Sequence, residues 1–504
     1  MKRFLPMLLC AALLLSGCGD QPSATSSSAP DSLVAQDGAA YHTQTEPPGA
    51  VCLGIYPTYS VHPTLSENRA NLTLAPLLYE PLFWVDGQFQ AVPVLCQSYA
   101  VSEDGLSWTF TLHGGITFSD GTPLTAQVVA AALELARQPA SRYAQRLQDV
   151  TSISGEGITL TVTLSRPNGA FPLLLDIPIA AGNADRPPGT GPYLLSAQGD
   201  ALTLQARADW WQQLPVPAQQ ISLAAVAKTD ELVAAFDSGE VSLVDVDLMG
   251  TNSLGYSGSY ETWDYSTTDL IYLGFNTQSG PCRSAAVRLA LAQAIDRNAI
   301  VQTDFALHAV PCTLPVHPSS PLYDDTLAQP LRHAPGALAE AADELGLTNR
   351  ALVLLVNSEN SAKVGAARRI AAELERAGLS VTLQKLSFED YLSALERRAF
   401  DLYLGEVVLT ADFDLSALLG SGGTLNYGGW RDGQWDTLLS ALREADDQQR
   451  PQAAAELLDY FNTQAPIAPI CFKSGSVLTQ WGRLAGLAPL RGNVFSRLES
   501  WRIQ

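Results

Sequence analysis

Alternating apolar and polar positions predict strands in the first half of the chain, and an apolar stretch between them predicts a helix. Residues 108–112 read Trp-Thr-Phe-Thr-Leu and residues 158–164 read Ile-Thr-Leu-Thr-Val-Thr-Leu. Every second side chain is apolar, as in a strand with one buried and one solvent-facing side. Between them, after the turn-like residues 119–123, Thr125 precedes an Ala- and Val-rich stretch that extends to about Arg137. We expect a helix there with Thr125 as its N-cap.

The second half of the chain contains a longer alternation of strand and helix patterns. The segments are an apolar run at Ala351–Val356, helical spacing over Ala362–Ala377 closed by Gly378, alternation over Leu379–Leu386, helical spacing over Phe388–Arg397 and a strand-like run at Asp401–Leu409. This β-α-β-α-β order predicts a parallel sheet, and ligands of such sheets bind beyond the carboxyl ends of the strands. The loops placed there are Asn357–Ser361, Ser387 and Thr410–Asp414, so topology alone predicts a site near Asp412.

The first residues have the composition of a targeting signal. Two cationic residues precede an apolar run over residues 4–15, which is shorter than the ~20 residues of a membrane span. The run ends in Leu-Ser-Gly-Cys at residues 15–18, which resembles the lipobox of bacterial lipoproteins. We expect a signal peptide at 1–17, and a lipidated Cys18 with a flexible linker at 18–50 that anchors an extracytoplasmic protein to the cell membrane. The alternative is an ordinary secretory signal with an incidental cysteine.

Composition narrows the possible functions. The 504 residues include 30 Lys and Arg against 51 Asp and Glu, which gives a net charge of −21. Such a charge argues against binding nucleic acid or an anionic membrane through a general basic surface. With 46% hydrophobic residues the chain can bury a large core, and its length exceeds the ~250–300 residues of a single core. We therefore expect two or more lobes.

Cysteine usage leaves the pairing open. Without Cys10 and Cys18, the remaining cysteines are Cys52, Cys96, Cys282, Cys312 and Cys471. Their number is odd, so at least one should be a free thiol. Cys282 and Cys312 flank one helical segment and are the candidate disulfide. No C-x-x-C pair indicates a zinc ribbon or a thioredoxin-type site.

Motifs of enzymes and metal sites are absent or incomplete. The sequence has no G-x-S-x-G, H-E-x-x-H, Walker A or G-x-G-x-x-G motif. Lys473-Ser474-Gly475 resembles a penicillin-recognition box but has no S-x-x-K partner, and the pair Asp245 and Asp247 lacks the rest of a calcium loop. His308, Cys312 and His317 match no standard metal spacing. We expect neither catalysis nor a bound metal or cofactor.

Several ordered motifs resemble the extracytoplasmic solute-binding proteins of family 5, the peptide and nickel group that serves ABC importers. The motifs are Asn71 with Leu77–Leu82, Trp108–Leu112, Phe118–Ala126, Gly189–Tyr193, Tyr272–Asn276 and Val287–Arg297. Their order and approximate spacing follow that family from residue 50 to the end. Taken together they are specific, whereas each alone is weak.

The resemblance implies an α/β fold of the two-lobed periplasmic-binding-protein type (type II), with an extra subdomain inserted in the first lobe. The first lobe would comprise residues 51–273 and 471–504, with the insertion at about 69–186. The second would comprise 274–470, and the chain would cross between the lobes near Asn276 and Cys471. Such lobes close over a ligand.

The resemblance also implies ligand-binding residues. Peptide binders of the family hold the ligand's ammonium group with an Asp in a Trp-x-Ala-Asp-Tyr-like stretch, which here reads Leu409-Thr410-Ala411-Asp412-Phe413. Asp412 matches the acid and Phe413 the aromatic residue, whereas Leu409 replaces the usual Trp. Alternatively, Asp412 or Asp414 caps the helix that starts near Leu415, and we assign Asp414 to that cap.

Further cleft candidates are Ser66, Glu67 and Asn68, which approximately match the family segment that lines the ligand between the first strand and helix. Phe275 and Asn276 are candidates because they lie beside the crossing, and Tyr427 and Trp430, in a Gly-rich segment, are candidates for an aromatic wall. Each can instead be an ordinary loop or packing residue.

We therefore expect a monomeric, membrane-anchored receptor that captures dipeptides or oligopeptides by lobe closure and delivers them to an ABC permease. The alternatives are a binder of another solute, such as a nickel chelate or an oligosaccharide, and a signalling or chaperone lipoprotein on the same fold. The sequence leaves the ligand's identity and length, the open or closed state and the cognate permease undetermined.

Overall fold

The structure is a computed structural model that describes residues 50–504 except residues 200, 252 and 349. The predicted signal peptide and Cys18, and the linker up to residue 49, lie outside these residues. The described residues belong to one compact unit. Among the described helices, none combines the length and the apolar character that crossing a bilayer requires.

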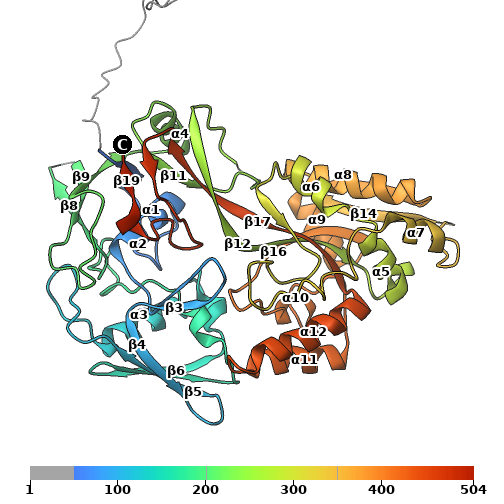
Figure 1. The fold of residues 1–504 in the computed structure, drawn as a ribbon, viewed down its shortest axis with the longest axis horizontal. Helices are drawn as coiled ribbons and strands as arrows, with labels where there is room; N and C mark the ends of the chain where they lie inside the picture. Colours follow the sequence, from blue (N-terminus) through green and yellow to red (C-terminus); the bar gives the residue numbers. More distant parts are fainter. Residues whose placement is uncertain (1–49, 200, 252, 349) are drawn as a thin grey trace, which may run out of the picture. The chain divides into compact units, whose positions relative to one another are not determined.

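One 11-stranded sheet organises the structure (Figure 1). Its neighbouring strands, in spatial order, are β15 (Ser380–Leu386), β14 (Ala351–Asn357), β16 (Leu402–Val408), β12 (Tyr260–Phe275), β17 (Ile467–Gln480), β11 (Leu243–Val246), β1 (Cys52–Ile55), β10 (Gln220–Ala225), β9 (Ala201–Ala206) and β8 (Tyr193–Gln198), with β13 (Ala309–Pro311) paired to β17. Helices α1 (Arg69–Thr73), α2 (Ala75–Leu78), α4 (Thr229–Asp237), α5 (Ala285–Gln293), α6 (Arg297–Thr303) and α7 (Pro335–Ala341) connect its strands.

The predicted β-α-β-α-β unit is present. Strand β14 pairs in parallel with both β15 and β16, and the connections are α8 (Ser361–Arg376) and α9 (Phe388–Glu396). Helix α8 buries a periodic apolar face and ends before Gly378, whose φ of +91° suits a residue without a Cβ. Strand β16 then leads into α10 (Ser416–Leu419), α11 (Gly433–Glu444) and α12 (Arg450–Gln464).

A separate antiparallel sheet carries the alternating strands of the first half. Its order is β4 (Cys96–Val101), β5 (Ser107–Leu112), β7 (Thr159–Leu164) and β6 (Val150–Glu156), and α3 (Ala126–Ala136) packs against it. In β5 and β7 every second residue is buried, as the alternation predicts. Thr125 caps α3 by accepting a hydrogen bond from the backbone N–H of Val128. Strands β2 (Phe83–Val85) and β3 (Ala91–Pro93) form a hairpin nearby.

Buried side chains form several cores. The second core lies between Leu82 and Ile179 and belongs to the antiparallel sheet and α3. The first core consists mainly of residues between Leu270 and Phe472. Two smaller cores surround β1, β10 and β11. These separate cores agree with a multi-part organisation, although the exact lobe boundaries at 273 and 471 stay a prediction.

Strands β12 and β17 link the first core to the part built on β1, β10 and β11. They pair over most of their length, with register shifts between Ser266 and Leu270 and between Ile271 and Tyr272. Lys473 on β17 is 3% exposed, and its Nζ lies 2.7 Å from Asp247 after β11 and 2.7 Å from Glu406 on β16. One buried ammonium group thus joins carboxylates from both sides of the crossing.

Charged residues within the family-like motifs are buried and bind backbone groups. The guanidinium of Arg288 donates to the carbonyls of Cys282 and Gln464. That of Arg297 donates to the carbonyls of Pro469, Ala292, Ile295 and Leu331. Burial lowers the pKa of Arg297 to about 10. These arginines therefore stabilise the fold instead of facing a ligand.

The predicted disulfide between Cys282 and Cys312 is not present. Cys282 and Cys312 are separate buried thiols. The backbone N–H of Cys312 donates to the carbonyl of Ile470, which ties it to β17, whereas the carbonyl of Cys282 binds Arg288. Helices α5 and α6 carry the chain from one position to the other, and burial raises the pKa of Cys282 to about 12.

We predict that Arg297→Lys lowers the free energy of unfolding by about 3 kcal/mol, because an ammonium group cannot reach all four carbonyls and each unsatisfied buried group costs ~1–3 kcal/mol. Urea unfolding followed by tryptophan fluorescence measures the change. Arg332→Lys at an exposed position is the matched control, with an expected change within ~0.5 kcal/mol. Equal stability of the two variants would contradict this role.

Candidate functional site

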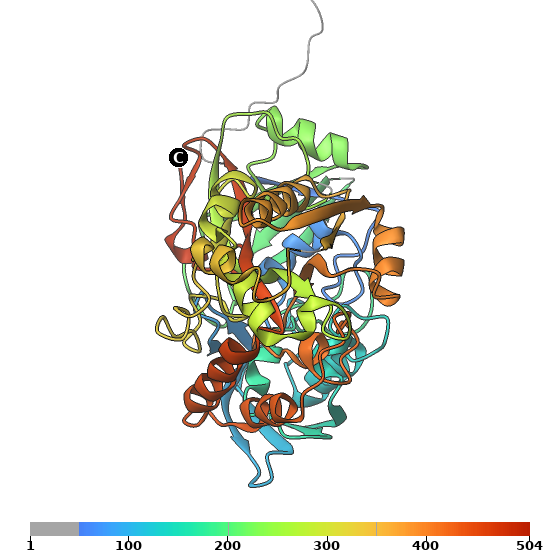
Figure 2. The ribbon, with the colours of Figure 1, turned by 90° about the vertical axis from the view of Figure 1, so that its right-hand side faces the viewer.

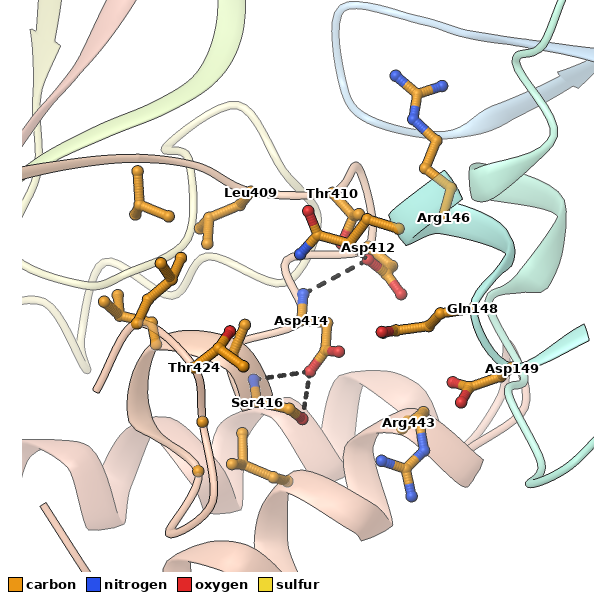
Figure 3. A pocket seen from close by; sticks show the side chains of 18 of the residues that line it. Arg146, Gln148, Asp149, Leu409, Thr410, Asp412, Asp414, Ser416, Thr424 and Arg443 are labelled. Atoms are coloured by element: carbon orange, nitrogen blue, oxygen red, sulfur yellow. Dashed lines mark hydrogen bonds between the residues drawn. The ribbon is translucent and has the colours of Figure 1, made fainter. Parts of the chain in front are cut away.

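A cavity of about 770 Å³ follows the carboxyl end of β16. One side, the insert wall, consists of Gln145, Arg146, Gln148, Asp149, Arg166, Asn168 and Leu174. The other side, the β16 wall, consists of lining residues from Glu406 to Leu425 and from Asp436 to Arg443. The walls come from parts of the chain with different cores (Figure 3). A cavity therefore lies beyond the carboxyl end of β16, where topology predicts a site, and ligand binding there stays a prediction.

Asp412 is the most deeply placed carboxylate of the β16 wall. It is 5% exposed, and its Oδ1 accepts hydrogen bonds from Thr410 Oγ1 at 2.5 Å and from the backbone N–H of Asp414 at 3.4 Å. Burial raises the pKa of Asp412, and the neighbouring charge of Asp414 raises it further. The guanidinium of Arg450 donates to the Asp412 carbonyl at 2.7 Å. A cation from a ligand would offset the cost of keeping this carboxylate ionised.

The residue between the two aspartates points elsewhere. Phe413 has a φ of +56°, is 1% exposed and packs edge-on against Phe89 and Phe472, with ring centroids 4.9 and 5.9 Å apart. It anchors the loop in the first core and does not line the cavity. Asp414 Oδ1 accepts from Ser416 N–H and Oγ at 2.9 and 2.6 Å. The N-cap of α10 is Leu415, which has no side-chain cap, so the predicted cap at Asp414 is wrong and this residue instead stabilises the turn before the helix.

The insert wall presents guanidinium groups to the same cavity. Arg146, on the 3-10 helix Ala144–Leu147, donates to Asp176, whose side chain is 4% exposed. Arg491 also donates to Asp176, at 3.1 Å. Arg166 lies 2.8 Å from the Asp149 carboxylate. Two arginines thus share one buried carboxylate, whereas Arg166 has a partner of its own.

The two walls touch beside the cavity. The backbone N–H of Gly169 donates to the carbonyl of Arg443 at 2.8 Å, and a Cβ at position 169 would lie 2.0 Å from the carbonyl oxygen of Ala445. Both ribbon views place α11 beside the antiparallel sheet of the second core (Figures 1 and 2). Arg443 itself lines the cavity from the β16 wall. The absence of a side chain at Gly169 permits this close approach.

A second cavity of about 430 Å³ shares Arg146 and Val408 with the first. It contains further arginines and carboxylates: Arg69, Arg142, Arg491, Asp245, Asp247 and Asp269. Val408 is 63% exposed. Burial raises the pKa of Asp269 to about 6. The two cavities form adjoining parts of one polar cleft.

Of the ten residues predicted to bind ligand, Asp412 and Leu409 line the first cavity. Ser66, Glu67 and Asn68 lie apart from it, in the turn before α1. There Asn68 caps α1 through its side chain, and Ser66 Oγ accepts from the Asn68 N–H. These residues therefore organise the entry to α1.

The candidates beside the crossing and in the Gly-rich segment also have packing roles. Phe275 is fully buried, and Asn276 donates to the carbonyls of Arg398 and Phe400. The Tyr427 carbonyl accepts from Arg398 Nε. The ring of Trp430 lies 5.0 Å beneath the Arg288 guanidinium. None of the four lines the first cavity, because burial and backbone contacts hold them in the first core.

Sequence reasoning missed the insert wall. Arg146, Asp149 and Arg166 lie in short irregular or exposed segments and carry no motif. Position along the chain gives no signal that they line the same cavity as Asp412, since this depends on how the second core packs against α11. Arg443 was missed for the same reason.

The histidine and cysteine cluster does not assemble. His308 Nδ1 lies 2.9 Å from Asp264, whereas His317 packs between the rings of Phe89 and Phe472 at 5.0 and 5.1 Å. Cys312 pairs through its backbone with β17. In the part of the chain that the structure describes, no three His, Cys, Asp or Glu side chains are grouped as metal ligands would be.

Comparisons with known proteins identify relatives. Residues 90–426 match the family model described as bacterial extracellular solute-binding proteins, family 5 Middle. The glutathione-binding protein GsiB of Salmonella choleraesuis (strain SC-B67) is 26% identical over 445 residues, which cover 82% of this chain and 85% of that protein. GsiB of Shigella flexneri serotype 5b (strain 8401) is 29% identical over 320 residues, which cover 60% of this chain and 61% of that protein.

A solved structure shows the same fold. HbpA2 from Haemophilus parasuis superposes with a TM-score of 0.75 at 21% identity, covering 90% of this chain and 99% of that chain. The predicted fold class, a two-lobed periplasmic-binding-protein-like α/β fold, is confirmed.

We predict that His317 makes the fold acid-sensitive. Burial lowers its pKa from 6.5 to about 4, so below pH 6.5 the unfolded chain takes up a proton that the folded chain does not. Its contribution is complete above pH 6.5 and falls as the pH drops, by about 3 kcal/mol at pH 4. Urea unfolding at pH 7.5 and pH 4 should show this extra loss in the wild type but not in His317→Gln. The same pH dependence in both proteins would contradict the assignment.

Proposed function

Since the chain belongs to the bacterial extracellular solute-binding proteins of family 5, which serve ABC importers, we propose that its solute is a short peptide with a free ammonium group. The observation that carries this proposal is the buried carboxylate of Asp412 in the first cavity. A carboxylate in a partly dry cleft attracts a cation far more strongly than one in water. The glutathione-binding relatives support a peptide-like solute, because glutathione is itself a modified tripeptide.

The capture mechanism is a shift between open and closed arrangements of the lobes. A ligand favours closure only if it contacts both lobes, because equal affinity for the two states shifts no equilibrium. The insert wall and the β16 wall are the surfaces through which it would do so. We propose the lobes to be residues 51–273 with 471–504, and 274–470, with the insertion at about 69–186. No bond of the solute is made or broken in this mechanism.

We also propose that Cys18 is lipidated and anchors the receptor outside the cytoplasmic membrane. Its Leu-Ser-Gly-Cys context supports this assignment. Cys18→Ala should move the protein from the membrane fraction to the medium or the soluble extracytoplasmic fraction. Immunoblotting of fractionated cells measures this distribution. Cys10→Ala is the control and should leave the distribution unchanged. Membrane retention of the Cys18 variant would contradict the anchor.

We expect Asp412→Asn to weaken binding of a free-amine peptide at least ~10-fold, because a charge-assisted hydrogen bond to the ammonium group is lost. Isothermal titration calorimetry with glutathione, Ala-Ala-Ala and Ala-Ala-Glu, each free and N-acetylated, measures the effect. The N-acetylated forms should lose less than ~3-fold on the same substitution.

Asp120→Asn, in an exposed turn, serves as the control and should leave every affinity unchanged. Equal losses for free and acetylated peptides would remove Asp412 from ammonium binding. Binding of a nickel chelate or an oligosaccharide, but of no peptide, would replace the proposed solute. The absence of binding by any of these solutes would favour a signalling or chaperone role.

A further inference from the structure

We infer that Arg142, Arg146 and Arg491, here named the arginine subsite, bind a carboxylate of the solute in the second cavity. The solute then extends from Asp412 in the first cavity, past Val408, to the arginine subsite. This inference rests on the proposed function and adds the direction in which the peptide lies and the need for a negative charge at its far end. It predicts that peptides with a free carboxylate are preferred over their amides.

The charges of the two walls are complementary. At the arginine subsite, Arg146 and Arg491 share the single carboxylate of Asp176, which is 4% exposed. On the β16 wall, the carboxylates of Asp412 and Asp414 share the charge of the buried Arg450. One positive charge on the first side and one negative charge on the second are therefore not neutralised locally. A zwitterionic solute that bridges the cavities satisfies both.

Arg146 is held in place for this contact. Its guanidinium lies 5.0 Å from the ring centroid of Tyr143, and among the described residues its hydrogen bonds involve Nη1 and Asp176. Figure 3 shows the side chain leaving the 3-10 helix in the direction away from Asp149 and Arg443. Because it lines both cavities, its remaining N–H groups are available where the cavities meet. A guanidinium can bind a carboxylate with two parallel hydrogen bonds.

Arg491 supplies a second indication of a missing acceptor. Its Nη2 donates to Asp176 at 3.1 Å, but its Nε is buried and has no hydrogen-bond partner among the described residues. A buried donor without an acceptor costs ~1–3 kcal/mol. A ligand carboxylate in the second cavity would provide the acceptor. Arg142, which is exposed and lies 5.6 Å from the same Tyr143 ring, adds a further positive charge.

The acidic groups of the second cavity are engaged with other partners. Asp245 accepts from Tyr265 at 2.8 Å and lies 3.8 Å from Arg69. Asp247 is paired with Lys473 at 2.7 Å. Burial raises the pKa of Asp269 to about 6, so at pH 7 this group is mostly ionised and shares its charge between Lys473 and Arg491. Asp176 and Asp269 together offset two of the three arginines, so one positive charge of the arginine subsite remains.

The test is a double-mutant cycle between Arg146 and the ligand carboxylate. The probes are glutathione with its glycine monoethyl ester, and Ala-Ala-Ala and Ala-Ala-Glu with their C-terminal amides. In the wild type, masking the carboxylate should weaken binding ~10- to 100-fold, whereas in Arg146→Gln it should do so less than ~3-fold. Arg137→Gln, whose side chain pairs with Glu134 away from both cavities, should behave like the wild type.

Arg146→Lys controls for a folding defect caused by loss of the positive charge. It keeps the charge beside Asp176 but cannot form two parallel hydrogen bonds to a carboxylate. It should show an intermediate dependence on the carboxylate, and thermal melting of each variant checks that it is folded. Equal dependence on the carboxylate in the wild type, Arg146→Gln and Arg146→Lys would overturn the subsite while leaving the peptide assignment intact. Failure of every free peptide to bind would instead overturn the proposed function, and the subsite with it.

Discussion

The pairing of β12 with β17 is the constraint on which the rest of the molecule depends. These strands link the first core to the part built on β1, β10 and β11. Lys473 reinforces the link from within. Burial opposes its charge, but the carboxylates of Glu406 and Asp247 raise its pKa, so the ammonium group stays charged. Removing one member of such a buried set leaves an uncompensated charge, which costs ~3–5 kcal/mol. In the proposed mechanism, movement between the parts bends these strands, and the register shift between Ser266 and Leu270 is where the pairing is already interrupted.

The two cavities are lined by charged side chains from the parts of the chain that these strands link. The cleft separates the arginines of one wall from the aspartates of the other. Local ion pairs such as Arg166 with Asp149 already have a partner of opposite charge. A solute that carries both signs supplies what each wall lacks. In the proposed mechanism ligand binding and closure are coupled electrostatically, because each wall holds one end of the solute.

Much of the architecture could be predicted from local patterns. Alternation in β5 and β7 and helical spacing in α8 report burial directly, because one face of each element must be apolar. The position of Asp412 beside a cavity could be predicted because parallel strands end at the same edge of a sheet. The packing contacts of Asn276 and Trp430 could not be predicted, because the direction of a side chain near a crossing depends on packing between distant segments. Arg146 gave no signal because its partners Asp176 and Arg491 are distant in sequence, and the Cys282–Cys312 pairing failed because flanking a helical segment does not bring two thiols together.

The left-handed backbone at Phe413 directs its side chain into the first core, whereas Asp412 and Asp414 on either side line the first cavity. The ring is fixed among Phe89 and Phe472, while the carboxylates on either side of it line the first cavity. Anchoring and the proposed ligand recognition thereby fall to different positions, so a substitution at 412 or 414 leaves the anchoring ring untouched. Such a loop can acquire a new cargo preference by few substitutions without repacking the interior, which makes it a favourable starting point for evolutionary divergence and for engineered sensors.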